Sequence, residues 1–398
     1  MDQARYRELL DAAPAVLAVE RHLCVPGNGV PGSFTYGYGS ARSVGTRVKA
    51  LTDDADVLLI SDRVLSELGL VALLSEWLQA SGFRVTQFCD VDPEPHVGTA
   101  EAAVELARTS GIRAVVGVGG GSVLDVSKIV ALSLQTGESV DALTLPGGLR
   151  PGMSMAPLLL LPTTAGTGSE TSIYAVLTSG TTKRALANAA LVPGGAILDP
   201  LLTFSMPKRV TAMTGMDALA HAIEALMHKA ATPMCTALSI GAVHLIANSL
   251  RQGCAEPENY QARFEMLLGS AMAMMSFSQS GGLWAHSVSY VLGHHFAIPH
   301  GLGCALGLPA LIRFNEAECA DTLNVFAGML GGGDAAVQVQ RLMADIALPT
   351  SLKEIGIKED SLPDLAKEMA LLYPRPFNPR PMDESQQLEY WRSMYRGL

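Results

Sequence analysis

The chain has 398 residues, of which 48% are hydrophobic, and it carries a formal net charge of −10 at pH 7. This length and apolar content allow two domains with substantial cores. The acidic balance, without any cluster of Lys or Arg, argues against nucleic acid or an anionic membrane as a partner. A small molecule is therefore the expected partner.

The sequence predicts neither a membrane span nor an export signal. The apolar runs at 158–161 and 271–275 are far shorter than the roughly 20 residues that a membrane-spanning helix needs. The N-terminus lacks the basic start and apolar middle of a signal peptide. The six cysteines are scattered without a Cys-x-x-Cys pair, so neither a disulfide framework nor a thiolate zinc site is expected. We expect a soluble, cytoplasmic protein with reduced thiols.

The first half of the chain alternates short apolar runs with helical stretches. The pattern predicts strands at 56–60, 84–88, 113–118 and 158–161, with helices at 101–109 and 122–134. Continuous apolar strands separated by helices imply a parallel sheet covered on both faces. We expect residues 1–205 to form an α/β domain of the nucleotide-binding type. Its first 33 residues are an extension, with a helix at 4–22 and a Pro/Gly-rich turn, to which no function is assigned.

After Asp199-Pro200 the pattern becomes helical, with hardly any strand signal. Helices are predicted at 210–229, 235–251, 261–277, 284–292 and 303–314. Residues 206–398 are therefore expected to form an all-helical domain, with 331–333 as a loop between helices.

Three features of the first half suit a dinucleotide. The segment GVGGGS at 117–122 follows a strand and opens a helix, where backbone N–H groups and the helix dipole favour a pyrophosphate. Such Gly-rich turns also commonly connect a strand to a helix without binding a ligand. Asp62, after the first strong strand, would accept hydrogen bonds from ribose hydroxyls and repel a 2′-phosphate, or it would simply cap a helix. The segment PTTAGTGSE at 162–170 places further donors at the carboxyl edge of the sheet.

Four potential metal ligands lie in the second half. Asp217 and His221 are four residues apart, so both can reach one divalent ion from a single helix face. His286 follows, and then His300 in a Pro-His-Gly turn. One carboxylate and three imidazoles suit a first-row metal such as iron or zinc.

Together, GGGSVLDVSK, PTTAGTGSE, GMDALAHAIE and the late Pro-His-Gly resemble the iron-containing (group III) alcohol dehydrogenase family in order and separation. The resemblance runs from about Phe34 to the Asn378-Pro-Arg-Pro segment. It implies an α/β plus all-α fold: an N-terminal parallel-sheet dinucleotide-binding domain, then a helical domain that holds a divalent metal at the interdomain cleft.

The resemblance also implies roles for individual residues. Asp62 lies near the adenosine ribose, and Asp125 and Lys128 mainly fix the phosphate loop. The other cofactor contacts are Gly119, Gly120, Gly121, Ser122, Thr163, Thr164, Thr167 and Lys183. The metal ligands are Asp217, His221, His286 and His300. The expected cofactors are NAD, with NADP disfavoured by Asp62, and Fe²⁺, with Zn²⁺ as an alternative in isolated protein because zinc binds such sites more tightly.

One position departs from the family pattern. Many relatives carry a histidine four residues after the third ligand, where it is thought to help proton exit, and this chain has Tyr290. An unperturbed tyrosine, with a pKa of about 10, is a poor relay at neutral pH; His294 and His295 are alternative relays through water. Trp284 and Tyr290 flank His286 and are candidates for an apolar wall of the substrate pocket, with simple core packing as the alternative for Trp284.

The predicted function is a metal-dependent, NAD-linked alcohol dehydrogenase or aldehyde reductase. Maleylacetate reductase is the second hypothesis. It ranks below the first because those enzymes tend to carry His-His where this chain has Trp284-Ala285. A hydroxyacid–oxoacid transhydrogenase is the third. Dehydroquinate synthase fits less well, and a non-catalytic nucleotide sensor would be favoured by a missing ligand, whereas none is missing. The substrate is expected to be a small alcohol, aldehyde, hydroxyacid or oxoacid, and the protein a homodimer or higher homo-oligomer.

Overall fold

The computed structural model describes residues 1–14, 21–23, 32–180 and 182–397. Contacts within the chain divide it into two compact units. The sheet unit comprises residues 1–164 and 168–205, and the helical unit comprises residues 165–167 and 206–398. Cys24 and the Pro/Gly-rich turn predicted near the N-terminus lie outside the described residues.

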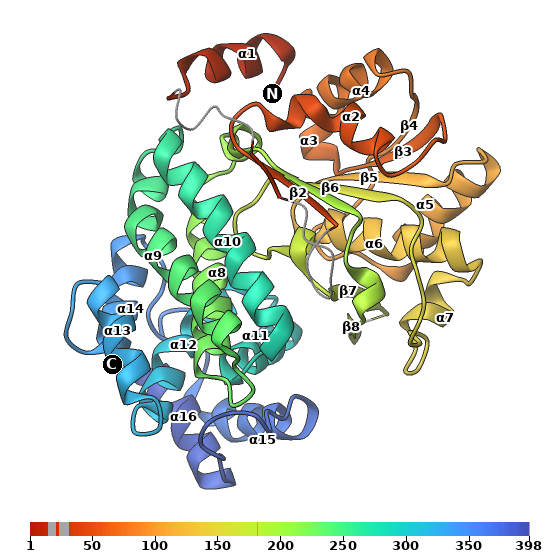
Figure 1. The fold of residues 1–398 in the computed structure, drawn as a ribbon. Helices are drawn as coiled ribbons and strands as arrows, with labels where there is room; N and C mark the ends of the chain where they lie inside the picture. The colour runs from red at the N-terminus through yellow and green to blue at the C-terminus, as the bar shows by residue number, and fades with distance from the viewer. Residues whose placement is uncertain (15–20, 24–31, 181, 398) are drawn as a thin grey trace. The chain divides into compact units, whose positions relative to one another are not determined.

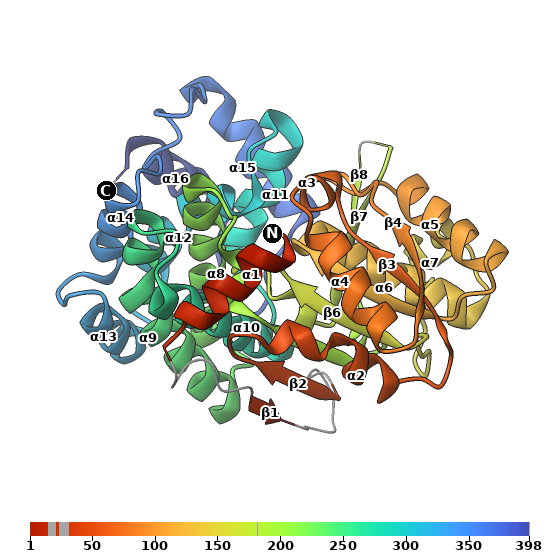
Figure 2. The ribbon, with the colours of Figure 1, turned by 90° about the horizontal axis from the view of Figure 1, so that it is seen from above.

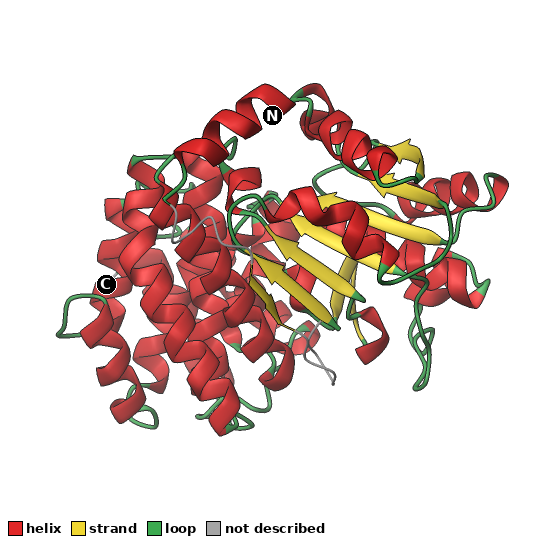
Figure 3. Ribbon diagram, turned by 45° about the horizontal axis from the view of Figure 1, so that its top comes forward, coloured by secondary structure: helices red, strands yellow, loops and turns green. Residues whose placement is uncertain are grey.

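The sheet unit is built on a seven-stranded sheet, drawn in yellow in Figure 3. The strand order is β1-β2-β9-β6-β5-β3-β4, and within the described part of this sheet only the β1–β2 pair is antiparallel. The strands are β1 (Arg21–Leu23), β2 (Ser33–Tyr36), β3 (Asp56–Ile60), β4 (Arg84–Phe88), β5 (Ala114–Gly119), β6 (Leu158–Pro162) and β9 (Gly195–Leu198). Because β3, β5 and β6 are parallel neighbours, the segments that follow them meet at one edge of the sheet.

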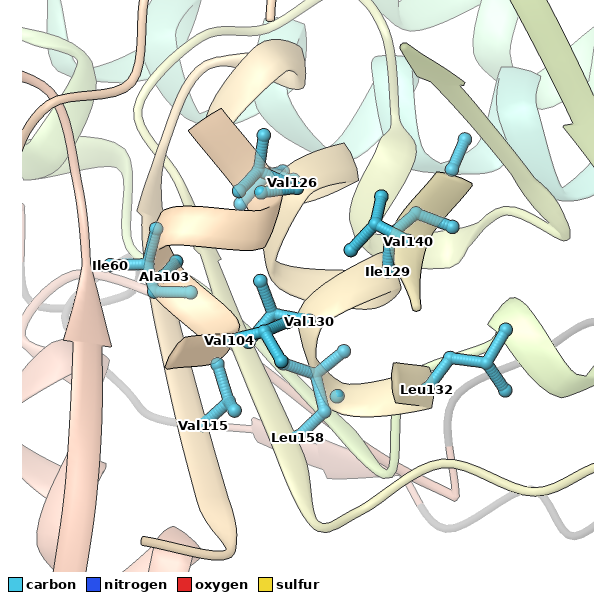
Figure 4. Packing of buried hydrophobic residues seen from close by; sticks show 14 of the residues in the cluster. Ile60, Ala103, Val104, Val115, Val126, Ile129, Val130, Leu132, Val140 and Leu158 are labelled. Atoms are coloured by element: carbon cyan, nitrogen blue, oxygen red, sulfur yellow. The ribbon is translucent and has the colours of Figure 1, made fainter. Parts of the chain in front are cut away.

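The core of the sheet unit forms where the central strands are apolar on both faces. Every residue of β5 and β6 is buried. Figure 4 shows Val130 of α6 (Gly121–Thr136) beside Val115 of β5 and Leu158 of β6, and Val126 and Ile129 of the same helix belong to the same buried cluster. A β-carbon on Gly119 would lie 2.6 Å from the Val123 side chain, so glycine is needed there for α6 to approach β5.

Shorter elements complete the sheet unit. Its other α-helices are α1 (Gln3–Ala12), α2 (Val44–Lys49), α3 (Arg63–Glu67), α4 (Leu70–Ala80), α5 (Val97–Thr109) and α7 (Val140–Thr144). β7 (Tyr174–Ser179) and β8 (Thr182–Ala187) pair as a separate antiparallel hairpin.

The N-terminal helix is shorter than the sequence predicts. α1 ends at Ala12, Ala13 is extended and residues 21–23 are a strand, so the predicted helix at 4–22 is wrong at these positions, while residues 15–20 lie outside the described part of the chain. Pro14 is the physical reason, because proline disfavours helical backbone in the residue before it. Tyr6 anchors α1: its hydroxyl donates to the buried carboxylate of Asp199, and its ring meets the ring of Trp77 on α4 edge-on at 4.9 Å. Figure 2 shows α1 beside α4.

The described part of the helical unit contains no strand. Its α-helices are α8 (Lys208–Met227), α9 (Pro233–Ala255), α10 (Tyr260–Ser280), α11 (Trp284–Phe296), α12 (His300–Asn315), α13 (Ala320–Met329), α14 (Ala335–Asp345), α15 (Leu362–Leu372) and α16 (Glu384–Arg396). α8, α9 and α10 pack side by side (Figure 1). The turn at 331–333 joins α13 to α14, as predicted.

The α9 helix is long and apolar enough, by length and composition alone, to cross a membrane, a test that a buried core helix also passes. α9 packs against α8, α10 and α13, which accounts for its apolar character as a core helix of the helical unit. The predicted fold class, a parallel-sheet α/β part followed by a helical part, is confirmed.

Candidate cofactor and metal sites

The glycine-rich loop lies between β5 and α6. β5 ends at Gly119, Gly120 is the N-cap residue of α6, and the helix begins at Gly121. A β-carbon on Gly120 would have only atoms of Thr164 within 4 Å, the nearest at 3.5 Å. The backbone at the positive end of α6 is therefore open to a closely approaching anion such as a pyrophosphate. The predicted contact Ser122 donates its hydroxyl to the carbonyl of Pro93 at 2.5 Å.

The predicted contacts after the neighbouring strands meet this loop at the sheet edge. Thr163, directly after β6, is buried, and its backbone N–H donates to the Gly119 carbonyl at 2.9 Å. Asp62 follows β3 and caps α3, with its carboxylate accepting from the Leu65 N–H at 2.9 Å. The N-cap role considered for Asp62 is thus real. It uses one carboxylate oxygen, which leaves the other for a ribose hydroxyl.

Asp125 and Lys128 on α6 hold the next loop in place. Lys128 is buried and donates to the Ser172 carbonyl and hydroxyl and to the Tyr174 carbonyl at 2.8–3.0 Å. Asp125 accepts from the Ser169 hydroxyl at 2.6 Å and from the Val176 N–H at 2.9 Å. Burial lowers the pKa of Lys128 to about 8 and raises that of Asp125. These contacts agree with a structural role for both residues.

The remaining two predicted cofactor residues are Lys183 and Thr167. Lys183 on β8 forms a 2.9 Å ion pair with Glu94, and both side chains are partly exposed. Thr167 groups with the helical unit together with Ala165 and Gly166. A β-carbon on Gly166 would lie 2.5 Å from the Thr214 side chain of α8, so this short loop packs tightly on that helix.

Three of the four predicted metal ligands converge in the helical unit. Asp217 lies on α8, His286 on α11, and His300 opens α12. One donor atom from each lies within 4.8 Å of the others, and Nε2 of His300 is 3.7 Å from Oδ1 of Asp217. His221 lies beside this group, with its ring centroid 4.8 Å from that of His286, but its donor atom is not one of the mutually close set.

A glycine explains how α12 brings His300 to α8. A β-carbon on Gly301 would lie 2.2 Å from the Met213 carbonyl oxygen and 3.1 Å from Cβ of Asp217. Any larger residue would push the start of α12 away from Asp217. The Pro-His-Gly signature therefore combines a ligand with the backbone approach that places it.

Hydrogen bonds orient two of the imidazole rings. Nδ1 of His286 donates to the buried carboxylate of Glu224 at 2.6 Å, which leaves Nε2 as the lone-pair nitrogen. The Ser289 hydroxyl donates to the His300 carbonyl at 2.8 Å and so accepts from Nδ1 of His300, also at 2.8 Å. Both rings thus present Nε2 as a potential ligand.

The site fits a divalent metal because several of its buried polar atoms lack a hydrogen-bond partner within the described part of the chain. Oδ1 of Asp217, Nδ1 of His221 and Nε2 of His286 are buried without a hydrogen-bond partner among the described residues. Leaving such an atom unsatisfied costs about 1–3 kcal/mol, and a cation bound by all of them removes that cost. Burial, and then the neighbouring His286, lower the pKa of His221 well below its ordinary value, which keeps the ring neutral as a ligand must be.

Two residues of this centre were missed by the sequence analysis. Glu224 lies three residues after His221 and seven after Asp217, so helical spacing could have placed it on the ligand face. Burial would raise the pKa of Glu224, but the His286 ring and its hydrogen bond bring it below its usual range. Cys304, four residues after His300 on α12, is the other, and its thiol sulfur is 3.7 Å from Nε2 of His300. Burial and the charge of Asp217 raise its pKa well above the ordinary thiol value.

The predicted pocket residues have different surroundings. Trp284 is buried, as expected for the core-packing alternative. Tyr290 is half-buried, and its ring centroid lies 5.7 Å from that of His300 and 5.1 Å from that of Tyr373. His294 and His295, the alternative relays, both hydrogen-bond to Glu368 on α15.

Two protein-family models match the chain. Residues 31–200 match iron-containing alcohol dehydrogenase, and residues 211–395 match the C-terminal domain of the Fe-containing alcohol dehydrogenase family. Together they cover the sheet edge and all four candidate ligands.

Individual relatives agree with these matches. The chain is 36% identical over 344 residues to long-chain-alcohol dehydrogenase 1 of Geobacillus thermodenitrificans, covering 83% of this chain and 87% of that protein. The crystal structure of 1,3-propanediol oxidoreductase is 30% identical with a TM-score of 0.87, covering 93% of this chain and 99% of that one. Sulfoacetaldehyde reductase from Bifidobacterium kashiwanohense, in complex with NAD⁺, is 28% identical with a TM-score of 0.83, covering 94% and 98%.

Proposed function

The chain belongs to the iron-containing alcohol dehydrogenase family, and from this premise we propose that its sheet edge and its buried Asp/His cluster together catalyse hydride exchange between NAD and a small alcohol or aldehyde. The family and the reaction class, an NAD-linked oxidoreductase acting on CH–OH groups, are confirmed as predicted. The observation that carries the proposal is the convergence of unpaired, buried ligand atoms from α8 and α11.

The cofactor residues act by binding and orientation. The N-terminus of α6, with Gly120 open above it, is proposed to hold the pyrophosphate, and Asp62 the adenosine ribose. Thr163 and Thr164 would continue this contact, because they follow the strand next to β5. Thr167 and Lys183 remain proposed contacts from the family resemblance. A carboxylate at Asp62 would repel a 2′-phosphate, so NAD is favoured over NADP.

The metal residues act by holding one divalent ion beside three buried ligand side chains. Asp217, His221, His286 and His300 are the proposed ligands, with iron as the family's metal. When bound, the metal supplies Lewis acidity toward the substrate oxygen, and the nicotinamide supplies the hydride acceptor or donor. Glu224 and Ser289 fix the rings of His286 and His300, so the ligand nitrogens are preorganised before any ion binds.

The substrate is proposed as a small alcohol or aldehyde. The three named relatives act on a long-chain alcohol, a diol and sulfoacetaldehyde according to their names, so family membership does not select one carbon skeleton. None of the three is named a maleylacetate reductase or a transhydrogenase. We also propose a cytoplasmic location and a homo-oligomeric state.

The test is a metal and turnover assay on matched variants. Protein loaded with Fe²⁺ should oxidise a member of a panel of short diols, linear and aromatic alcohols and hydroxyacids with NAD. His286→Ala and His300→Ala should lose most bound metal and turnover but keep NAD affinity, whereas His244→Ala, an exposed histidine on α9, should behave as wild type. Stoichiometric metal and full activity in His300→Ala would refute the ligand assignment.

A further inference from the structure

The metal centre contains a second possible ligand set. The four donor atoms that lie within 4.8 Å of one another are those of Asp217, His286, His300 and the thiol of Cys304. His221, a proposed iron ligand, is outside this close set although its ring packs beside it. Cys304 is fully buried one helical turn after His300, on the same face of α12.

The separations match ligands that share an ion. Tetrahedral zinc, with Zn–S of about 2.3 Å and Zn–N of about 2.0–2.1 Å, places sulfur and nitrogen roughly 3.5 Å apart. The observed distance from Sγ of Cys304 to Nε2 of His300 is 3.7 Å, and from that nitrogen to Oδ1 of Asp217 it is also 3.7 Å. The nitrogen-to-oxygen distance is too long for a hydrogen bond, yet it is near the value for two ligands of one ion.

The cysteine is not an isolated thiol. Oδ1 of Asp217 and Nε2 of His286 are buried and without hydrogen-bond partners among the described residues. Nε2 of His300 carries the lone pair, because Nδ1 donates to Ser289. Three nitrogen or oxygen donors thus surround the same point as the sulfur.

We propose that Asp217, His286, His300 and Cys304 form an alternative ligand set selective for zinc, in which the thiolate of Cys304 takes the place of His221. This inference rests on the proposed metal site. As the Zn–S bond forms, the thiol proton leaves to solvent and no electrons are transferred. Thiolate favours zinc over metals that prefer oxygen and nitrogen ligands. Four protein ligands close a tetrahedral site, as in structural zinc sites, so the zinc form has no position for the substrate oxygen and is inactive.

X-ray absorption tests the proposal directly. Metal-free protein is given one equivalent of Zn²⁺, and its spectrum should contain one sulfur at about 2.3 Å. A cobalt-substituted sample should show thiolate-to-metal charge transfer in the near ultraviolet. Cys304→Ser should lose both signatures and bind zinc roughly 10-fold or more weakly, with Fe²⁺ affinity within about 3-fold of wild type. Cys235→Ser, which changes another buried cysteine of the helical unit, should keep both signatures.

His221→Ala separates the two ligand sets. It should bind zinc with sulfur still present but lose most of its Fe²⁺ affinity. A wild-type zinc spectrum with nitrogen and oxygen ligands alone overturns the proposal, and this needs no variant to fold. If zinc is bound through nitrogen and oxygen ligands alone and His300→Ala no longer binds it, the proposed metal site stands and only the role of Cys304 fails. If the wild type binds neither Zn²⁺ nor Fe²⁺ stoichiometrically, the proposed function fails as well.

Discussion

Nδ1 of His286 donates a 2.6 Å hydrogen bond to Glu224, and both side chains are buried. The same carboxylate accepts from the backbone N–H groups of Leu283 and Ala285, each at 2.8 Å, at the start of α11. Glu224 therefore fixes both the ring of His286 and the helix that carries it.

Glu224→Gln should weaken metal binding by roughly 10–100-fold, because an amide is a poorer acceptor for the ligand imidazole. Chelator competition with purified protein measures this change. Glu256→Gln, an exposed change after α9, is the control and should have no effect. Unchanged metal affinity in Glu224→Gln would show that the hydrogen bond does not tune the ligand.

The charge of Asp62 can be removed without removing its helix cap. Serine is also a good N-cap residue, so Asp62→Ser should keep α3 while relieving repulsion of a 2′-phosphate. The ratio of kcat/KM with NADP to that with NAD should rise on the order of 10-fold, which corresponds to about 1.4 kcal/mol. A wild-type enzyme that prefers NADP would contradict the role given to Asp62.

The ion pair between Lys183 and Glu94 should compete with the cofactor. Exposed pairs contribute about 0–1 kcal/mol, so Glu94→Gln should tighten NAD binding by at most about 5-fold. Fluorescence titration with NAD measures it. In a Lys183→Ala background the same change should have no effect; an equal gain there would mean that Glu94 acts independently of Lys183.

Tyr290 is expected to shape the substrate pocket. Its ring lies against His300 and Tyr373, so Tyr290→Ala should mainly change KM and the range of alcohols accepted. Tyr290→Phe keeps the ring and should leave kcat nearly intact. A loss of roughly 10-fold or more in kcat for Tyr290→Phe, with metal content and NAD affinity unchanged, would instead make its hydroxyl part of the proton path.

Asp199 should make stability depend on pH. Burial raises its folded-state pKa to about 6 from 3.8, so between these values the folded state holds a proton that the unfolded state has lost. Stability then falls as pH rises from about 3 to 7, by about 3 kcal/mol in total for this group. Asp199→Asn has no titrating group at this position. The urea concentration at its unfolding midpoint should therefore rise relative to that of wild type as pH increases over this interval. Asp53→Asn, at an exposed position, should show a constant difference.

The sequence patterns predicted the strands that are apolar throughout and the helices whose apolar residues recur regularly. β3 and β4 have the predicted bounds, and β5 and β6 differ by one residue at their ends, because the central strands β3, β5 and β6 are continuous apolar runs. The first five helices of the helical unit, α8 to α12, were likewise found from their periodicity, although each begins or ends a few residues away from its prediction. The family signatures add the order of the site residues along the chain.

Elements that depend on distant partners could not be predicted in this way. β2 and β9 are four residues each and become strands by pairing with one another and with β1 and β6. The hairpin of β7 and β8 mixes polar and apolar residues without regular alternation. Glu224 and Cys304 acquire their surroundings only when α8, α11 and α12 pack together, although their helical spacing from known candidates was visible.

The loop at 165–167 has a consequence for recombination between related genes. The chain leaves the sheet unit after Thr164, returns after Thr167, and leaves again after Ser205. A chimera joined at 205/206 would inherit Gly166 from one parent and the Thr214 surface beneath it from the other. A β-carbon at position 166 would clash with Thr214, so hybrids whose parents differ at either residue should misfit at this contact, whereas hybrids whose parents share both residues avoid this clash.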